Sequence, residues 1–103
     1  MTAAGPAGDS RQAPGDGWYV YMVRCADGSL YTGIARDLER RVREHNGSLL
    51  GARYTRGRRP VELAYWEAAP DRAAASRRER QLKTLAKDAK EALIRAATAT
   101  PTA

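Results

Sequence analysis

The stretch WYVYMVRCADGSLYTGI, residues 18–34, restricts the fold of this chain more than any other part of the sequence. Its first eight residues are mostly aromatic and β-branched, which is typical of a β-strand. The letters ADG indicate a turn, and SLYTGI indicates a returning strand. We therefore predict a β-hairpin that carries tyrosines on both of its strands.

The length of the turn decides whether these tyrosines lie together. With a two-residue Asp-Gly loop, Tyr21 and Tyr31 would lie on opposite faces of the hairpin, because side chains alternate along a strand. With a three-residue loop that ends in a left-handed Gly28, Tyr21 lies opposite Gly33. Tyr19, Tyr21 and Tyr31 then share one face, with open space beside the ring of Tyr21. We predict the three-residue loop.

The remaining elements follow from periodicity, capping residues and turn residues. The predicted elements are a helix over 36–45, a loop with room for one helical turn over 46–60, a strand over 61–67, and helices over 69–86 and 87–97. In the third strand, Leu63 and Tyr65 alternate with Trp66, which predicts that Trp66 faces the other side. The order β-β-α-β-α-α predicts an α+β fold, a three-stranded antiparallel sheet flanked by helices.

The length of 103 residues predicts one domain. We expect a disordered tail over residues 1–16, the folded domain over 17–96 and a second tail over 97–103. No apolar run is long enough to cross a bilayer, and no secretory signal is recognisable. The single cysteine, Cys25, cannot form an internal disulfide, which fits a location in the cytoplasm.

The net charge of +6 predicts an anionic partner, and nucleic acid is the leading one. Basic residues gather in 36–60 and again in 71–90. For the second cluster, a solvated helix face explains the charge as well as phosphate contact does. For the segment YTRGRRP, we favour contact, because a loop that holds Arg56, Arg58 and Arg59 without acidic residues has no balancing partner for them.

Arg41 and His45 lie four residues apart in the first predicted helix and so share one of its faces. A short connection from the second strand brings this face close to the tyrosines. Taken singly, each residue has a structural explanation: strand tyrosines pack in cores, and helical arginines form salt bridges. Composition alone therefore predicts a basic nucleic-acid-binding domain and no particular reaction.

Taken together, these residues resemble the GIY-YIG nuclease domain. The letters YVY at 19–21 match its first motif and YTG at 31–33 its second, although Tyr19 replaces a glycine and Thr32 an isoleucine. Nine residues then separate Tyr31 from Arg41, and three separate Arg41 from His45, which is the family's spacing. The letters RRERQLK resemble its glutamate helix. The resemblance covers residues 17–96 and is strongest to the small, single-domain branch of the family.

The resemblance implies a metal-dependent endonuclease that hydrolyses phosphodiester bonds in DNA. The catalytic residues that it implies are Tyr21, Tyr31, Arg41, His45 and Glu79. Glu79 would hold one divalent ion, Mg²⁺ or Mn²⁺, and a lone carboxylate completed by waters suits Mg²⁺. The planar guanidinium of Arg41 suits phosphate oxygens. Tyr21 and His45 are rival general bases, and the sequence does not decide between them.

Six further residues are predicted to contact nucleic acid: Arg36, Arg40, Arg56, Arg58, Arg59 and Lys83. One small domain offers little surface for reading bases, so recognition of DNA structure is expected rather than of sequence. Two alternatives keep the fold. One is a binding module without activity, since no asparagine follows Asn46, whereas some members of the family use a late one. The other is a nuclease subunit that needs a larger protein partner for specificity.

Overall fold

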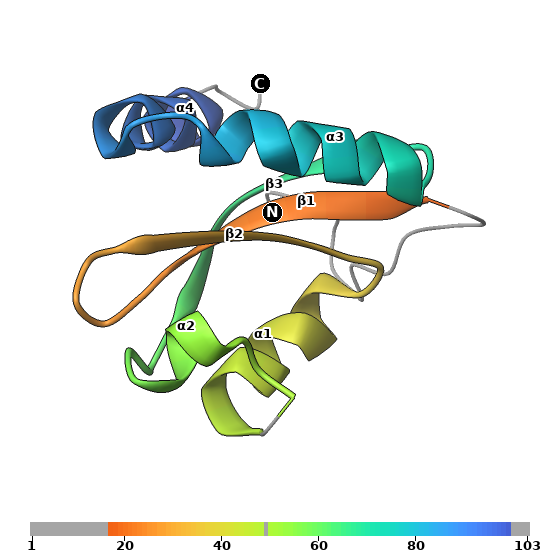
Figure 1. Ribbon diagram of the computed structural model, residues 1–103. Coiled ribbons are helices and arrows are strands. Elements are labelled where there is room, and N and C mark those ends of the chain that lie inside the picture. Colours follow the sequence, from red (N-terminus) through yellow and green to blue (C-terminus); the bar gives the residue numbers. More distant parts are fainter. Residues whose placement is uncertain (1–16, 49, 100–103) are drawn as a thin grey trace.

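The computed structural model describes residues 17–48 and 50–99 and has three layers, with a β-sheet between two pairs of helices (Figure 1). The elements in chain order are β1 (Trp18–Arg24), β2 (Leu30–Ala35), α1 (Leu38–Gly47), α2 (Arg53–Arg56), β3 (Glu62–Ala69), α3 (Arg72–Lys83) and α4 (Lys87–Ala99). The sheet is antiparallel in the order β2-β1-β3, so the predicted α+β fold is confirmed. The short helix α2 occupies the loop in which one helical turn was expected.

The structure describes only part of the two predicted tails. The predicted tail over residues 1–16 lies outside the described residues, as do residues 100–103. Helix α4 continues to Ala99, so the predicted second tail starts inside a helix. Within the described ranges, no helix combines the length and the apolar character that crossing a membrane requires. A location in the cytoplasm stays a prediction.

The hairpin between β1 and β2 has the predicted three-residue loop. The backbone N–H of Cys25 donates to the carbonyl of Ser29 at 2.8 Å, and Gly28 has a φ of 87°. Glycine adopts this left-handed conformation without the steric cost of a side chain. Tyr21 consequently lies opposite Gly33, as the three-residue loop requires.

The two faces of the sheet bury different residues against different helices. The tyrosine face carries Tyr19, Tyr21 and Val23, and Leu38 of α1 is buried against them. On the other face, Val20 of β1 is buried with Leu82 of α3. Each fully buried leucine of this kind stabilises the fold by about 2 kcal/mol. Since β1 is the central strand, a side chain on either face of it is held between its neighbours and a helix.

Strand β3 departs from the predicted alternation. Met22 pairs with Tyr65 and Val23 pairs with Leu63, so Ala64 has no partner on β1 and forms a β-bulge. Leu63 and Trp66 both pack on the tyrosine face as a result, while Tyr65 packs on the other face. The prediction that Leu63 and Tyr65 share a face was wrong, because the bulge reverses the alternation between them.

Helices α1 and α3 both begin at aspartate caps. The carboxylate of Asp37 accepts from the backbone N–H of Arg40 at the start of α1. Asp71 accepts in the same way from Ala74 at the start of α3. Such a cap satisfies one of the helix's unpaired amides and contributes about 1 kcal/mol. The cap at Asp37 starts α1 right after β2, so His45 lies over the tyrosine face.

Candidate active site

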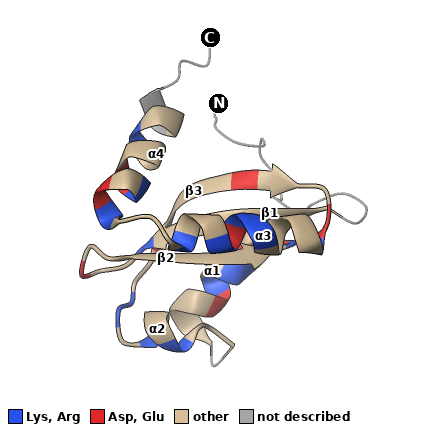
Figure 2. Ribbon diagram, turned by 45° about the horizontal axis from the view of Figure 1, so that its top comes forward, with Lys and Arg blue, Asp and Glu red and all other residues tan. Residues whose placement is uncertain are grey.

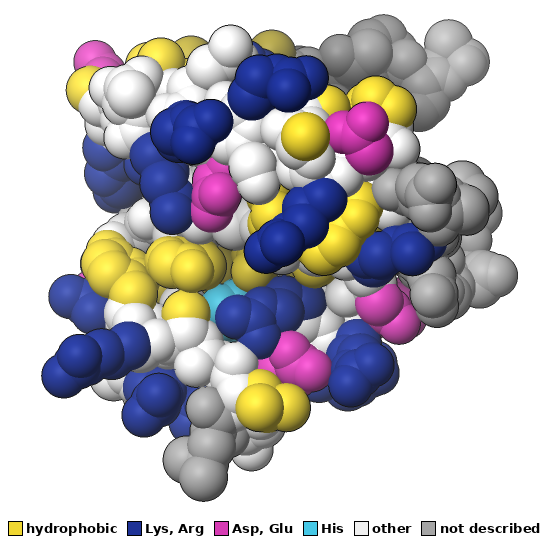
Figure 3. All heavy atoms as spheres, turned by 45° about the vertical axis from the view of Figure 1, so that its right-hand side comes forward, with side chains coloured by type: hydrophobic (Ala, Val, Ile, Leu, Met, Phe, Trp, Pro, Cys, Tyr) yellow, Lys and Arg dark blue, Asp and Glu magenta, His cyan; other side chains and the backbone are white. Residues whose placement is uncertain are grey.

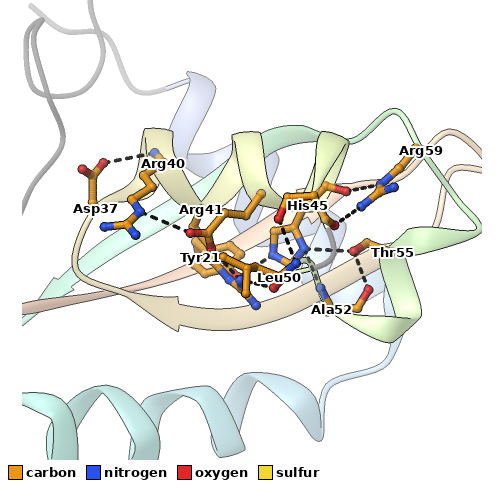
Figure 4. A network of polar contacts seen from close by, with 11 residues as sticks. Tyr21, Asp37, Arg40, Arg41, His45, Leu50, Ala52, Thr55 and Arg59 are labelled. Carbon is orange, nitrogen blue, oxygen red and sulfur yellow. Dashed lines mark hydrogen bonds and ion pairs between the residues drawn. The ribbon is translucent and has the colours of Figure 1, made fainter.

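Tyr21 is the central residue of the site and points from the middle of β1 toward α1 (Figure 4). Its side chain is almost fully buried. The ring lies directly against the backbone of Gly33, where a β-carbon would be only 2.7 Å from the hydroxyl oxygen. The open space predicted beside the ring is therefore filled by the ring itself. The hydroxyl oxygen lies 2.8 Å from Nε2 of His45.

His45 is fully buried and joins α1 to the loop that contains α2. Its Nδ1 lies 2.9 Å from the hydroxyl oxygen of Thr55, and that hydroxyl donates to the carbonyl of Ala52, also at 2.9 Å. The hydroxyl has one hydrogen, so while it donates to Ala52 it can only accept from a protonated Nδ1. The backbone N–H of Ala52 donates to Nδ1 at 3.3 Å, and this contact requires the other tautomer, with the proton on Nε2. The contacts of Nδ1 therefore support both tautomers of His45, and Nε2 accepts from Tyr21 in the one that is protonated on Nδ1.

The pKa values of both groups are shifted so that each side chain is neutral at pH 7. Burial, assisted by the charge of Arg41, lowers the pKa of His45 to about 4. Burial raises the pKa of Tyr21 to about 12, and the charge of Arg41 opposes this rise. At pH 7 the pair is therefore a neutral imidazole hydrogen-bonded to a neutral phenol.

Arg41 lies one turn before His45 on α1, and its guanidinium is held from two sides. One nitrogen, Nη1, donates at 2.7 Å both to the carboxylate of Glu44 and to the carbonyl of Leu50. The Arg41 pair lowers the pKa of Glu44, which keeps this carboxylate ionised. The guanidinium is close enough to lower the pKa of both Tyr21 and His45. Glu44 thus positions a permanent positive charge beside the phenol.

Tyr31 lies on the other side of the imidazole. Its ring is edge-to-face with that of His45, with the centroids 5.4 Å apart, and it is stacked against Tyr54 at 5.7 Å. The ammonium of Lys83 lies 6.0 Å from the Tyr31 ring. Because Lys83 belongs to α3, this contact links the site to the helix that covers the opposite face of the sheet.

Glu79 lies one turn before Lys83 on α3, and its carboxylate is 3.1 Å from the ammonium of that lysine. The carboxylate also contributes to the raised pKa of Tyr21, so it lies within electrostatic range of the phenol. In Figure 3, a depression crosses this side of the molecule, and the single histidine lies at its bottom with basic side chains beside it. The predicted catalytic side chains of β1, β2, α1 and α3 therefore gather in one region.

A metal ion would have Glu79 as its carboxylate ligand. Among residues 17–48 and 50–99, no three His, Cys, Asp or Glu side chains are grouped as metal ligands. The side chain of Glu79 is 22% exposed and pairs with the half-exposed ammonium of Lys83. An accessible single carboxylate fits a largely hydrated Mg²⁺, which keeps most of its waters. The residues present are thus compatible with such an ion.

The predicted nucleic-acid-binding arginines fall into two groups. Arg36 and Arg40 line a pocket of about 260 Å³ with Arg41, and Arg56 is exposed on α2. Figure 2 marks the positions of basic residues along the ribbons of α1, α2 and α3. The remaining two, Arg58 and Arg59, are engaged within the protein.

The contacts of these two arginines are made with distant parts of the chain. Arg58 donates to the carboxylate of Asp27 at 3.1 Å, and Arg59 donates to the carbonyls of His45 and Ser48. The premise that these arginines lack a partner was wrong, because the hairpin turn and the end of α1 supply partners from elsewhere in the sequence. Contact with nucleic acid stays a prediction for both.

Three residues of the site were not singled out from the sequence: Glu44, Tyr54 and Thr55. Glu44 belongs to a helix with many charged residues, where an ion pair on the surface was the expectation. Tyr54 and Thr55 lie in the loop with the predicted helical turn, and no periodic pattern assigns their direction there. Thr55 is fully buried against His45, which only the folded loop reveals.

Comparison with known proteins gives concordant matches. The GIY-YIG catalytic domain matches residues 17–92, which include every candidate catalytic residue. The UPF0213 protein DP2720 of Desulfotalea psychrophila is 54% identical over 79 residues, 77% of this chain and 72% of that protein. The UPF0213 protein SSP2268 of Staphylococcus saprophyticus is 47% identical over 77% of this chain and 95% of its own length. The solution NMR structure of the UPF0213 protein BH0048 from Bacillus halodurans is 44% identical, covers 76% of this chain and 82% of that one, and has a TM-score of 0.49.

Proposed function

Because the chain belongs to the GIY-YIG catalytic domain family, we propose that it is a metal-dependent endonuclease that hydrolyses phosphodiester bonds in DNA. The observation that carries this proposal is the contact of 2.8 Å between the Tyr21 hydroxyl and Nε2 of His45. In the tautomer protonated on Nδ1, the buried phenol donates to a neutral imidazole and is arranged for proton transfer.

The proposed roles follow from this pair and its neighbours. Tyr21 orients the attacking water and takes up its proton while the proton of the phenol moves to Nε2 of His45. Thr55 accepts from Nδ1 and keeps Nε2 turned toward the phenol. In this relay neither residue acts as a base alone, which suits a phenol with a pKa of about 12 and an imidazole with a pKa of about 4.

The negative charge that develops on the phosphate requires cationic partners. Arg41, held by Glu44 at 2.7 Å, is placed to bind the non-bridging oxygens. A divalent cation held by Glu79 would supply Lewis-acid stabilisation of the phosphate and lower the pKa of Tyr21. Lys83 competes with this ion for Glu79, because its ammonium lies 3.1 Å from one of the two carboxylate oxygens.

The test is cleavage of branched, nicked and duplex DNA by the purified protein in Mg²⁺ or Mn²⁺. We expect products with either ion, none with EDTA, and none from the Glu79→Ala and Arg41→Ala variants. Each variant should still bind the same DNA in EDTA, Arg41→Ala more weakly because it lacks a phosphate contact, which would show that the loss is of reaction rather than of folding. Cleavage that persists in Glu79→Ala would point to a contaminating nuclease and count against the proposal.

One observation favours a second candidate function, DNA binding without cleavage. The carboxylate of Glu79 is neutralised by Lys83, so the protein as it stands has a satisfied ion pair where the ion would bind. Salt-sensitive DNA binding with no products in either metal would support this second candidate. If the protein needs a larger protein partner, the purified protein alone should not cleave DNA, but it should do so after a cell extract is added. Glu79→Ala with the same extract should not cleave.

A further inference from the structure

Tyr54 presents an aromatic ring at the surface immediately beside the candidate active site. Among the described residues, it is one of two large hydrophobic side chains that are exposed, with 38% of its surface accessible. Its ring stacks on that of Tyr31, with the centroids 5.7 Å apart and 28° between the planes. Tyr31 in turn contacts the imidazole of His45. An aromatic surface therefore extends from the buried imidazole to the outside of the protein.

Arg58 covers the ring of Tyr54 with its guanidinium, 4.0 Å from the ring centroid. The guanidinium is fixed there, because it also donates to Asp27 at 3.1 Å and to the carbonyl of Tyr54 at 2.8 Å. Lys83 lies 6.0 Å from the ring of Tyr31. We call Tyr31, Tyr54 and Arg58 the aromatic stack. It is a series of planar groups at the surface with positive charge on both sides.

The buried anchor of helix α2 is Thr55 and not Tyr54. Thr55 is fully buried and contacts His45. The Tyr54 side chain of the same helix points outward and leaves more than a third of its surface in water. Exposed aromatic rings next to fixed cations are a recurring way to bind single-stranded nucleic acid, because every base offers a flat face for stacking.

We propose that the aromatic stack binds an unpaired base of the substrate strand on the outer face of the Arg58 guanidinium, which the Tyr54 ring supports, beside the phosphodiester bond to be cleaved. A base within a duplex has both faces covered by its neighbours, so the stack selects a strand that is single at this point. Arg58 and Lys83 would neutralise the flanking phosphates. In Figure 3, hydrophobic side chains lie beside the histidine in the same depression, with basic side chains around them. This proposal rests on the proposed function in taking nucleic acid as the ligand.

The experiment measures binding and not cleavage, so that its outcome is separate from that of the proposed function. The protein carries Glu79→Ala throughout and is kept in EDTA. The probes are a single-stranded DNA with one 2-aminopurine and the duplex formed from it, compared at one salt concentration. We expect tighter binding of the single strand and quenching of the 2-aminopurine fluorescence as the base stacks.

Substitution of Tyr54 assigns the effect to the ring. Tyr54→Ala should weaken binding of the single strand about tenfold and remove the quenching, with little change for the duplex. Tyr54→Phe should retain both the affinity and the quenching, and Tyr54→Leu should lose both while keeping apolar bulk on α2. The matched charge control is Arg72→Ala, which removes a guanidinium 5.5 Å from the ring of Trp18 and should affect single strand and duplex alike.

Two results would overturn the proposal. One is that Tyr54→Ala binds the single strand and quenches 2-aminopurine as strongly as the parent protein. If Tyr54→Ala does not fold, the same result with folded Tyr54→Leu would count equally. The other is a Tyr54→Phe protein that loses as much as Tyr54→Ala, which would assign the effect to the hydroxyl. A protein that cleaves duplex DNA but fails these tests retains its proposed function and loses only this substrate preference.

Discussion

Gly33 has no side chain where the phenol of Tyr21 crosses β2, and a β-carbon there would lie 2.7 Å from the hydroxyl oxygen. Two ring carbons of Tyr21, Cζ and Cε2, would lie 2.9 and 3.2 Å from the same β-carbon. The phenol can reach His45 only because it lies flat against the backbone of the neighbouring strand. Gly33 is thus a positioning residue for the Tyr21 hydroxyl.

Gly33→Ala should therefore separate Tyr21 from His45. The added methyl group must displace a buried ring, which we expect to cost about 1–3 kcal/mol of unfolding free energy and most of the cleavage activity. Urea denaturation and initial cleavage rates measure the two effects. Gly47→Ala is the matched control, since its β-carbon would meet nothing within 4 Å. Equal behaviour of the two variants would contradict the proposed positioning.

Removal of the Tyr21 hydroxyl should affect both stability and reaction. In Tyr21→Phe, Nε2 of the buried His45 loses its partner, so we expect a loss of about 1–3 kcal/mol in unfolding free energy. Cleavage should fall at least about 100-fold, because the proton relay is broken. Tyr65→Phe is the control, since this hydroxyl donates to Glu67 away from the site. Its cleavage rate should stay close to that of the unmodified protein, and a similar fall in both variants would argue against a role of Tyr21 in the reaction.

The buried imidazole predicts a dependence of stability on pH. The pKa of His45 is lowered from 6.5 to about 4, so between these pH values the unfolded chain takes up a proton that the folded chain does not. Lowering the pH through this window should reduce the unfolding free energy, in total by on the order of 3 kcal/mol, and above it the contribution is constant.

Denaturant midpoints measured from pH 7.5 down to 4.5 test this dependence. His45→Gln cannot titrate, so its curve should be flatter over the same range even if the variant is less stable throughout. Glu44 and Glu67 have lowered pKa values and add their own loss of stability only at more acidic pH. A flat curve for the unmodified protein would show that the imidazole is not held neutral by burial.

The pair between Lys83 and Glu79 predicts competition with the metal ion. Lys83→Met should lower the Mg²⁺ concentration required for half-maximal cleavage by about twofold to fivefold at saturating DNA, the size expected for a partly exposed ion pair. Lys87→Met is the matched control, because Lys87 pairs with Glu91 with the same four-residue spacing on α4. An unchanged Mg²⁺ requirement in Lys83→Met would argue against Glu79 as the ligand.

The hairpin shows how far local sequence determines this fold. The turn residues allowed two registers, and the left-handed conformation of Gly28 selects the one that places Tyr21 and Tyr31 on one face. This choice was predictable because it depends on the turn itself. The bulge at Ala64 was not, because β3 has a regular alternation in sequence and departs from it only in its pairing with β1.

The candidate site divides in the same way. Arg41 and His45 lie on one helical face, which spacing predicts, and Asp37 caps the helix as expected. Thr55 and the partner of Arg58 could not be predicted, because each depends on how an irregular loop folds back on a distant element. The contact of Thr55 with His45 spans 10 residues of sequence and that of Arg58 with Asp27 spans 31, and neither produces a periodic pattern in the sequence.

This long-range folding separates two arginines of one loop into different roles. Arg59 donates to the carbonyls of His45 and Ser48 at the end of α1, whereas Arg56 is exposed on α2. Arg59→Ala should lose about 2 kcal/mol of unfolding free energy, since it leaves partly buried carbonyls without a charged donor. Arg56→Ala should unfold like the unmodified protein but reduce the slope of log affinity against log salt for DNA by about 1. Urea denaturation and DNA binding at several salt concentrations, measured on both variants, test this assignment, and each variant is the control for the other. If Arg59→Ala reduced the salt slope and kept its stability, Arg59 and not Arg56 would be the residue that contacts DNA.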